Sequence, residues 1–472
     1  MNRPVSEDAA AVLMPGFVGT ELPAWLAARL RAGLGGVCLF GENVRNREQL
    51  RALTDAIRDA NPAALIAIDE EGGDVTRLYD AVGSPYPGNA LLGRINDPEL
   101  TAQVASTVAR ELRAVGVNLN LAPDVDINSN PDNPVIGVRS FGADPELVAQ
   151  HAAAWIRAHE AEGVPVSAKH FPGHGDTAQD SHHALPIVDA SLDQLREREL
   201  RPFLAAVQSG ASTIMTSHIL LPALDADHPA TLSSAILRDL LRDELGFDGV
   251  IVSDALDMAG ASGETGIAVA AVRAVAAGCD FLCIGTGNTD EQLAEIQAAI
   301  ETAVADGALD GDRLHDAAER VRGLAATAGA PTPLGGTPTP AFDVDRAIAA
   351  FDIGREVVPP REGRIVTIET SANMAVGGSP WGPVAAGADT VRVFEGDAAP
   401  ASERPLILVG KDNHRRQWTR ELITAARAAN PSTLVVDMGW PSPDRAYADV
   451  ATFGASRFAG EALLTWLERE AQ

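Results

Sequence analysis

The segment Gly249-Val-Ile-Val-Ser-Asp254 contains the pattern that decides the fold. Its β-branched residues predict a short buried strand, and an ionisable residue follows where that strand ends. Apolar runs of the same kind recur through the first 290 residues. They lie at Val12–Met14, Gly36–Phe40, Ala64–Ile68, Val117–Leu121, Pro165–Ala168, Thr213–Thr216, Gly249–Val252 and Asp280–Ile284. This recurrence predicts eight strands.

Stretches with helical spacing separate these strands. They are rich in Ala, Leu, Arg and Glu and include Leu22–Ala32, Pro98–Val115, Asp144–Glu162, Leu192–Ser209 and Glu264–Ala277. Alternation of strand and helix is typical of parallel βαβ units. Eight such units within roughly 300 residues predict an α/β fold, a (β/α)8 barrel of the TIM type. A doubly wound open sheet is the alternative architecture.

Polar and ionisable residues gather where the predicted strands end. The segments that follow five of the strands are Asp69-Glu-Glu-Gly-Gly73, Ala122-Pro-Asp124, Lys169-His170, Ser217-His218 and Ser253-Asp254. Each of them, taken singly, is explained as a turn, but five in phase are harder to explain in that way. In a barrel the carboxyl ends of all strands meet at one face, where the active site lies.

A break in the pattern lies between Ala330 and Pro340, a segment with four prolines and two glycines. This composition is typical of an inter-domain linker. Beyond it we expect strands at Arg364–Ile368, Thr390–Val393, Leu406–Val409 and Thr433–Val436, and helices at Arg415–Ala429 and Ser456–Glu470. The sequence therefore predicts a catalytic barrel in residues 1–330, a linker in residues 331–342 and a smaller C-terminal α/β domain in residues 343–472.

The charge of the chain excludes some classes of partner. Of its 472 residues, 65 are acidic and 37 are basic, which gives a formal net charge of −28. Proteins that bind nucleic acid or anionic membranes carry basic surfaces, so we expect neither partner. The basic residues include only two lysines, Lys169 and Lys411, and the others are all arginine.

The N-terminal segment and the cysteines indicate a compartment. Residues 1–17 hold an acidic pair before any apolar run, and no stretch reaches the roughly 18 uncharged apolar residues that a membrane span requires. We therefore expect a soluble cytoplasmic protein. Cys38, Cys279 and Cys283 are too few for a disulfide framework and lack partners for a zinc site, so we expect buried thiols.

The densest group of ionisable residues lies in residues 167–183, which read SAKHFPGHGDTAQDSHH. Two glycines and a proline predict a loop that follows a strand end. Asp180 precedes His182 by two residues, close enough for a hydrogen bond that fixes the imidazole tautomer and raises its basicity. We therefore predict that His182, paired with Asp180, is a general acid/base. A solvated polar loop is the alternative.

Asp254 is the candidate nucleophile. A carboxylate that is held rigidly at the mouth of a strand can attack an electrophilic carbon. Aspartate is also a preferred N-cap residue, so capping of the following helix is the alternative role. Asp257 competes with Asp254, but it lies three residues further along, where we expect a turn or a helix.

A further set of side chains suits the hydroxyl groups of a sugar. Lys169 stands in a chain that otherwise uses arginine, which indicates a site that needs a compact ammonium group. Asp69 and Arg77 lie eight residues apart around a Gly-Gly turn, and Arg139 lies in Gly137-Val-Arg-Ser-Phe-Gly142. Surface ion pairs are the alternative role for Asp69 and Arg139.

Three motifs together resemble one family. Lys169-His-Phe-Pro-Gly-His-Gly175 with Asp180-Ser-His182, then Ser253-Asp-Ala-Leu-Asp-Met258, and Asp69-Glu-Glu-Gly-Gly-Asp-Val-Thr-Arg77 resemble glycoside hydrolase family 3, in its β-N-acetylglucosaminidase branch. The resemblance covers about residues 10–325, with the motifs in the right order. The linker and the C-terminal domain resemble those of two-domain members.

The resemblance implies a retaining, exo-acting double displacement on terminal β-linked N-acetylglucosamine. Asp254 matches the nucleophile that forms the glycosyl-enzyme, and His182 with Asp180 matches the acid/base. The residues that match sugar-holding positions are Asp69, Arg77, Arg139, Lys169 and His170, with His218 near the sugar. We expect no cofactor and no metal.

An imidazole acid/base opens an alternative activity. Most retaining glycosidases use a second carboxylate instead. An imidazole is neutral once the leaving group has departed, so it does not repel an anionic acceptor as a carboxylate would. Phosphate is therefore an alternative acceptor to water, and a β-N-acetylglucosaminide phosphorylase is the alternative enzyme. Muropeptides, as in peptidoglycan recycling, and chitobiose are the candidate substrates.

Three other functions stand beside this one. A metal-dependent barrel hydrolase would use His170, His174, His182, His218 and Asp254, but the first strand lacks the His-x-His pair typical of that class. A non-catalytic sugar-binding protein is disfavoured by the intact nucleophile and Asp/His dyad. Nucleotide binding is disfavoured because Ile284-Gly-Thr-Gly-Asn288 lacks the third glycine of the dinucleotide motif.

Overall fold

The structure is a computed structural model that describes residues 3–177, 185–263, 265–335, 342–371, 375–398 and 400–470. Its contacts divide the chain into two compact units. The first unit comprises residues 1–70, 98–127 and 144–338, and the second comprises residues 71–97, 128–143 and 339–472. These units cut the chain differently from the predicted domains, because two early segments belong to the second unit. The predicted boundaries themselves stay a prediction, since residues 336–341 of the linker lie outside the described part.

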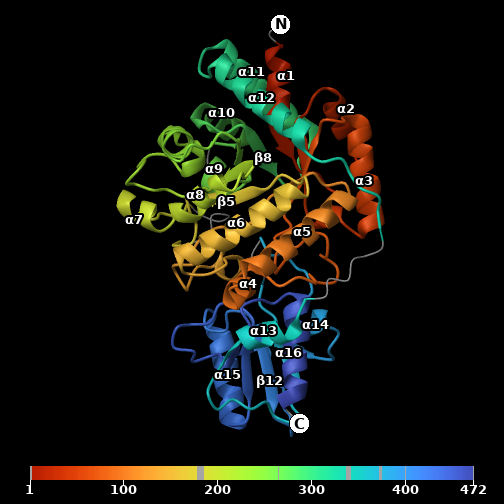
Figure 1. The fold of residues 1–472 in the computed structure, drawn as a ribbon, viewed down its shortest axis with the longest axis vertical. Coiled ribbons are helices and arrows are strands. Elements are labelled where there is room, and N and C mark those ends of the chain that lie inside the picture. The colour runs from red at the N-terminus through yellow and green to blue at the C-terminus, as the bar shows by residue number, and fades with distance from the viewer. Residues whose placement is uncertain are drawn as a thin grey trace. The chain divides into compact units, whose positions relative to one another are not determined.

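Eight short strands form the centre of the first unit (Figure 1). They are β1 (Leu13–Pro15), β2 (Gly36–Leu39), β3 (Leu65–Ile68), β4 (Leu119–Asn120), β5 (Ser167–Phe171), β6 (Thr213–Thr216), β7 (Val250–Ser253) and β8 (Phe281–Gly285). All eight are buried along their length. Each one lies within a few residues of its predicted position, since an apolar run between turn signals leaves the chain little else to form.

The strands pair in parallel and in cyclic order. One sheet has the order β1-β8-β7-β6-β5 and the other the order β2-β3-β4. A parallel bridge between Asn120 and Val166 joins β4 to the residue before β5, and β1 lies beside β2. First and last strands are therefore neighbours, as a barrel requires and an open sheet does not allow. The predicted barrel is confirmed, and the doubly wound alternative is wrong.

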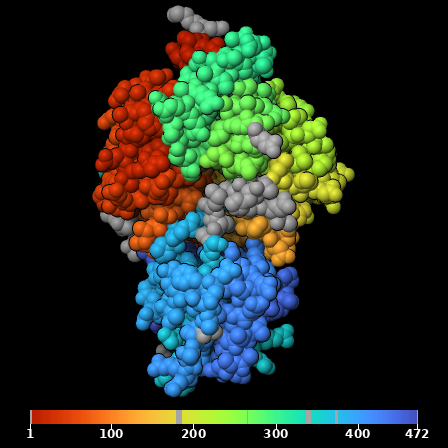
Figure 2. All heavy atoms as spheres, turned by 180° about the vertical axis from the view of Figure 1, so that it is seen from behind, coloured from red at the N-terminus to blue at the C-terminus, as the bar shows by residue number. Residues whose placement is uncertain are grey.

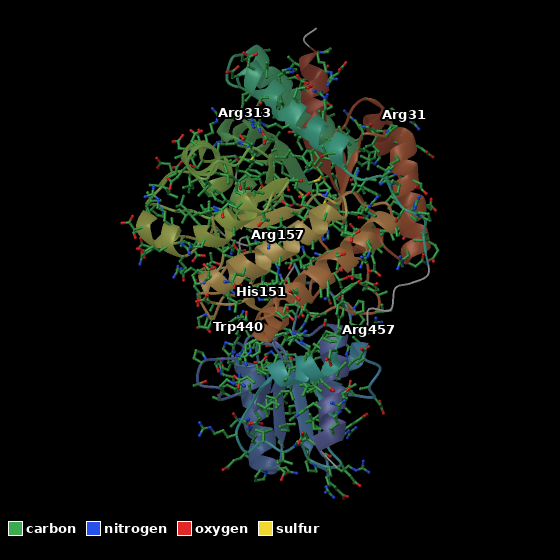
Figure 3. All side chains as sticks on the ribbon, in the orientation of Figure 1. Arg31, His151, Arg157, Arg313, Trp440 and Arg457 are labelled. Atoms are coloured by element: carbon green, nitrogen blue, oxygen red, sulfur yellow. The ribbon has the colours of Figure 1, made fainter. Side chains whose placement is uncertain are left out.

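Helices cover the outside of these strands. They are α1 (Val5–Ala11), α2 (Ala24–Arg31), α3 (Arg47–Ala60), α5 (Pro98–Ala114), α6 (Pro145–Ala161), α7 (Leu192–Glu197), α8 (Leu200–Gln208), α9 (Ala259–Ser262), α10 (Ile267–Ala277), α11 (Asp290–Ala305) and α12 (Gly311–Thr327), together with a π-helix at Ala235–Glu244. The red helix α1 lies beside α11 and α12 in Figure 1, and red atoms border green atoms in the same region of Figure 2. Helices α5 and α6 are neighbours, and His151 on α6 bonds Thr101 of α5 at 2.8 Å (Figure 3).

One predicted helix is two. The sequence pattern predicts a continuous helix over Leu192–Ser209, but α7 ends at Glu197 and α8 begins at Leu200. Pro202 explains the break, because in a continuous helix its ring would clash with the carbonyl of Arg198. In the observed structure Pro202 instead occupies the first turn of α8, where a missing N–H group is tolerated.

The fifth strand is longer than predicted. We expected Lys169 and His170 to follow this strand, but β5 includes both. The N–H of Val125 donates to the carbonyl of Lys169 at 2.8 Å, and the N–H of Ser217 donates to the last residue of β5 at 2.9 Å. Because neighbouring segments bond its backbone on both sides, β5 carries Lys169 and His170 on a rigid element rather than on a free loop.

The barrel interior explains the cysteines. Cys38 and Cys283 pack in one apolar cluster with Met14, Leu65 and Phe281. All three cysteines are buried and free, as predicted. Burial raises the pKa of the Cys279 thiol, which keeps this sulfur protonated and unreactive.

A mainly parallel sheet forms the second unit. Its order is β11-β10-β12-β13-β14-β9, and only β9 runs antiparallel to its neighbour. The strands are β9 (Asp352–Ile353), β10 (Arg364–Ile368), β11 (Val391–Val393), β12 (Leu406–Gly410), β13 (Leu434–Asp437) and β14 (Val450–Ala451). The helices are α4 (Asn89–Ile95), α13 (Val344–Ala350), α14 (Gly382–Ala385), α15 (Gln417–Ala429) and α16 (Arg457–Glu470). The predicted smaller α/β fold is confirmed.

Side chains alternate between the two faces of this second sheet. Ile407 and Val409 pack with Phe458 and Leu463 of α16, whereas Leu408 packs with residues of α15. Helices therefore cover both faces, which is why the strands are apolar almost throughout. Within the described residues, the helices are too short or too polar to serve as membrane spans.

Asp280, the residue directly before β8, forms ion pairs with two arginines. Its carboxylate is buried and pairs with Arg242 and with Arg313 of α12, the latter at 2.7 Å (Figure 3). It also accepts the N–H of Ile251 at 2.8 Å. A buried carboxylate between two guanidinium groups ties α12 and the π-helix to the strand layer.

We expect Asp280→Asn to destabilise the first unit by about 3–5 kcal/mol, because two arginines lose the charge that compensates them. Calorimetric or urea unfolding measures the loss. The matched control is Asp290→Asn, which removes the half-exposed partner of Arg29 and should cost less than about 1 kcal/mol. Equal losses in both variants would contradict this account of Asp280.

Candidate active site

Asp254 stands directly after β7, at the carboxyl end of the strand. Its Oδ1 accepts the N–H of Ala255 at 2.7 Å, and its own N–H donates to Thr216 Oγ1 of β6 at 3.4 Å. The side chain is partly exposed, while the strand before it is fully buried. A carboxylate on such a rigid support meets the geometric requirement for a nucleophile.

Asp257, the competing candidate for the nucleophile, has a structural role at the end of β8. Its Oδ2 accepts the N–H of Thr286 at 3.0 Å. A Cβ placed on Gly285, whose φ is +118°, would lie 2.0 Å from the Asp257 carboxyl carbon. The carboxylate therefore fills the space that a glycine at the end of β8 leaves open, which favours Asp254 as the reacting group.

Lys169 and Asp69 meet across the barrel ends. Lys169 Nζ donates to Asp69 Oδ1 at 2.6 Å, although 100 residues separate them in sequence. The lysine side chain is 3% exposed and the aspartate side chain 18% exposed. The pair is therefore not a surface ion pair, and the carboxylate edge retains access to solvent or to a ligand hydroxyl.

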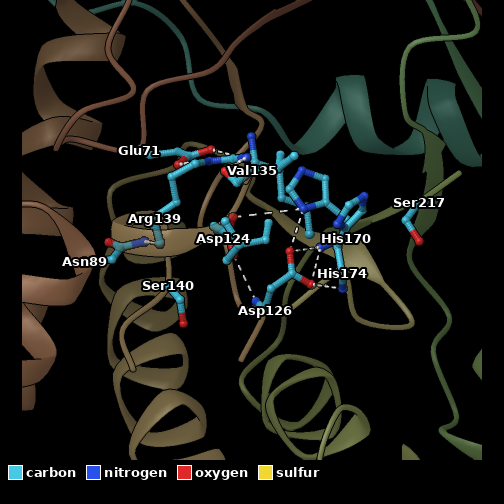
Figure 4. A network of polar contacts seen from close by, with 12 residues as sticks. Glu71, Asn89, Asp124, Asp126, Val135, Arg139, Ser140, His170, His174 and Ser217 are labelled. Carbon is cyan, nitrogen blue, oxygen red and sulfur yellow. Dashed lines mark hydrogen bonds and ion pairs between the residues drawn. The ribbon is translucent and has the colours of Figure 1, made fainter. Parts of the chain in front are cut away.

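A buried carboxylate orients His170 (Figure 4). The Asp126 Oδ2 atom lies 2.7 Å from His170 Nδ1, and its Oδ1 accepts the N–H of His174 at 2.6 Å. Because a carboxylate accepts hydrogen bonds, Nδ1 of His170 must carry a proton. Asp124 in turn accepts the N–H of Asp126 at 2.9 Å. The imidazole of His170 is thus held in one orientation and one tautomer.

The charges in this cluster follow from burial and pairing. Burial alone raises the pKa of Asp126, but the attraction of His170 and His174 outweighs it, and the net pKa lies below the usual value. Asp126 is therefore ionised at neutral pH. Burial lowers the pKa of His174 to about 4, so this imidazole is neutral at pH 7. The negative charges of Asp126 and Asp254 both act on His174.

His218 acts on the backbone next to Asp254. Its ring is buried, its Nε2 lies 3.0 Å from the carbonyl of Ala255, and its Nδ1 lies 2.8 Å from Thr231 Oγ1. Since a carbonyl only accepts, Nε2 donates to Ala255. This contact positions the residue after Asp254. The direct sugar contact that the resemblance implies for His218 stays a prediction.

The two predicted arginines belong to the second unit. Arg139 makes a bidentate pair with Glu71, with distances of 3.0 Å from Nε and 2.7 Å from Nη2, and both side chains are almost fully buried (Figure 4). Arg139 is therefore not half of a surface ion pair. Arg77 is also buried and donates from Nη2 to the carbonyl of Ala375 at 2.7 Å.

Asp180 and His182 lie outside the described residues. Their assignment as the acid/base dyad therefore stays a prediction. The described chain ends at Thr177 on this side, whose Oγ1 lies 2.9 Å from His174 Nδ1.

Metal binding has little support in the described part of the chain. One group there, formed by Asp124, Asp126 and His170, brings its ligand atoms within 4.8 Å of one another. Within this group His170 Nδ1 already bonds Asp126 Oδ2, and Asp124 Oδ1 already accepts the N–H of Asp126. Of the five ligands that a metal-dependent hydrolase would use, this group contains only His170.

Sequence reasoning missed the partners that hold the predicted residues. Asp126 and Glu71 were not singled out, although they orient His170 and Arg139. A weak signal was available, since Asp126 lies two residues after the noted strand-end Asp124, and Glu71 lies in the noted Asp69–Gly73 segment. Which carboxylate meets which cation depends on contacts across the barrel or between distant segments, which spacing does not reveal.

Titration of the histidines tests this cluster. We expect the imidazole of His174 to titrate near pH 4, because burial opposes its charge. Its folded pKa lies below the unfolded value, so stability that depends on neutral His174 should fall as the pH drops from about 6.5 to about 4. NMR of ¹⁵N-histidine, with His174→Gln for assignment, measures the midpoint, and a value above 6 would contradict the burial argument.

Comparisons with known proteins agree with this architecture. The model of the glycosyl hydrolase family 3 N-terminal domain matches residues 19–324. A β-hexosaminidase from Chromobacterium violaceum is 41% identical over 292 residues, which are 60% of this chain and 80% of that protein. β-Hexosaminidase A from Pseudoalteromonas piscicida is 40% identical over 313 residues, 60% of this chain, and the match spans only 52% of that relative's length.

A solved structure extends the similarity to nearly the whole chain. The family 3 β-N-acetylglucosaminidase from Paenibacillus sp. str. FPU-7 superposes with a TM-score of 0.88 at 30% sequence identity. The superposition includes 99% of this chain and 97% of the Paenibacillus chain. The resemblance inferred from the three motifs is thereby confirmed. This chain belongs to glycosyl hydrolase family 3.

Proposed function

We propose that this chain is a retaining, exo-acting β-N-acetylglucosaminidase. The observation that carries the proposal is the position of Asp254, a partly exposed carboxylate at the end of β7, within the electrostatic range of the Asp126–His170–His174 cluster. The family membership and the similarity to β-hexosaminidases and to a solved β-N-acetylglucosaminidase support the same activity.

In this mechanism Asp254 attacks the anomeric carbon. A bond forms from the carboxylate oxygen to that carbon while the glycosidic bond breaks, and the leaving oxygen takes a proton from the acid, assigned by resemblance to His182. Water, deprotonated by the same group, then attacks the anomeric carbon and releases Asp254. Two inversions return the original configuration, as in other retaining glycosidases.

The polar groups of β5 and of the segment after β3 fit a neutral sugar ring. The Lys169–Asp69 pair offers an ammonium donor and a carboxylate acceptor that are already oriented toward each other. His170 adds a ring that Asp126 fixes. Because these groups are ordered before the sugar binds, binding loses little side-chain entropy. We assign sugar binding to Lys169, Asp69 and His170 and, by resemblance, to Arg77 and Arg139.

The proposed function includes a substrate and a cellular location. We propose that the sugar is terminal β-linked N-acetylglucosamine on a muropeptide or on chitobiose, with a cytoplasmic role in peptidoglycan recycling. Kinetics on these two substrates and on aryl glycosides would rank them. A preference for aryl β-glucoside over aryl β-N-acetylglucosaminide would count against this sugar assignment.

Removal of the nucleophile tests the mechanism. We expect Asp254→Asn to lower kcat for 4-nitrophenyl N-acetyl-β-D-glucosaminide by at least about 1,000-fold, because an amide does not form the glycosyl ester. Release of nitrophenol measures kcat. In the wild type, mass spectrometry after trapping with a slow fluorinated substrate should place one sugar on Asp254.

The matched control is Asp243→Asn, an exposed aspartate of the π-helix, which should leave kcat unchanged. Turnover that survives Asp254→Asn would refute the assignment of the nucleophile. A sugar trapped on Asp257 instead would transfer that role to the competing residue.

The acceptor is tested separately. Under the hydrolytic proposal, free N-acetylglucosamine should be the product at millimolar phosphate, and the rate should not depend on phosphate concentration. Chromatography of the products with and without phosphate measures this. Formation of N-acetylglucosamine 1-phosphate would instead support the alternative enzyme, a phosphorylase in which a neutral imidazole does not repel phosphate.

A further inference from the structure

Glu199 is a buried carboxyl group that the mechanism does not use. It lies between α7 and α8, and it is 1% exposed. Its Oε1 accepts Nε of Arg198 at 2.6 Å, whereas its Oε2 is buried without a hydrogen-bond partner among the described residues. An unsatisfied buried oxygen is costly, so its retention calls for an explanation.

The unsatisfied oxygen faces the turn that follows β5. A Cβ placed on Gly173 would lie 2.8 Å from the Cβ of Glu199 and 3.0 Å from its Oε2. Gly173 has a φ of +128°, and its N–H donates to the carbonyl of His170 at 2.8 Å. The carboxyl group therefore lies against the turn that leads from His170 to His174.

Arg198 also joins Glu199 to Asp176, three residues after Gly173. Its Nη2 donates to Asp176 Oδ2 at 2.5 Å, while its Nε bonds Glu199. One guanidinium group thus links Glu199 to Asp176. The segment of residues 172–177 is held at Gly173 by contact with Glu199 and at Asp176 by its ion pair with Arg198.

The charged groups that face Glu199 are Arg198, Asp126 and Asp176. Burial is the largest influence on the carboxyl group, and together with the repulsion from Asp126 and Asp176 it outweighs the attraction of Arg198. The pKa of Glu199 is raised to about 7 from 4.5. A folded pKa above the unfolded one favours folding below pH 4.5, and this advantage disappears as the pH rises to about 7.

We propose that Glu199 is a positioning residue whose carboxyl group supports the Gly173 turn in its neutral form and destabilises the loop in its ionised form. The ionised form adds a negative charge to a region that already holds Asp126 and Asp176. Because Asp126 orients His170, which the Gly173 turn follows directly, ionisation of Glu199 weakens the binding of His170 to the sugar. The proposal rests on the proposed function, since it assigns His170 to the sugar.

The pH dependence of KM tests the proposal. We expect the KM of the wild type for 4-nitrophenyl N-acetyl-β-D-glucosaminide to rise by about threefold or more through pH 7, and the KM of Glu199→Gln to stay flat, because the amide does not ionise. The matched control is Glu197→Gln, an exposed neighbour on α7, which should retain the wild-type profile. A Glu199→Gln profile with the wild-type rise would overturn the proposal.

A second variant keeps the test decisive if Glu199→Gln does not fold. Asp176→Asn removes one repulsive charge, so the rise in KM should move to lower pH. An unmoved midpoint would overturn the role of Glu199. Infrared titration of the protonated carboxyl band reports on Glu199 without any turnover when it is carried out in an Asp437→Asn background, because the pKa of Asp437 is also raised to about 7. A protein without glycosidase activity that still shows this titration near pH 7 would refute the proposed function alone.

Discussion

The candidate site depends on the hydrogen bonds that the buried carboxylate of Asp126 makes with His170 and His174. Buried carboxylates are stable only when hydrogen bonds and opposite charges compensate the loss of water. Asp126 obtains this compensation from the ring of His170 and from the backbone of His174. The need to satisfy one charge therefore fixes His170 near the end of β5 and His174 in the segment after it, and with them the side of the barrel mouth where the sugar is proposed to bind.

The same constraint explains the ion pairs at both ends of the barrel strands. Lys169 meets Asp69 toward the carboxyl ends, and Asp280 meets two arginines at the amino end of β8. These pairs tie elements that are distant in sequence. Glu199 differs from these pairs, since its Oε2 is buried without a hydrogen-bond partner among the described residues. A site that binds an uncharged sugar needs polar groups that are already held in place. The Lys169–Asp69 pair is held in this way by its own ion pair, before any ligand binds.

Much of the fold follows from local pattern. The strand that ends before Asp254 is found within one residue of its prediction because apolar runs between turn signals have few other outcomes. The prediction of one helix over Leu192–Ser209 is wrong because Pro202 breaks a segment whose apolar spacing is otherwise helical. Lys169 and His170 were placed beyond β5 because strand length depends on pairing with neighbours, which the segment itself does not encode.

The sequence by itself determined the barrel class, the family and the identity of the candidate residues, from Asp254 and Lys169 to Arg139. These follow from residue types at set spacings, which are local properties of the chain. Only the tertiary structure decided the partners: Asp126 for His170, Glu71 for Arg139, and the assignment of segments 71–97 and 128–143 to the second unit. Such pairings depend on where distant segments meet in space, because a buried charge is compensated by whichever group the fold brings within hydrogen-bond distance.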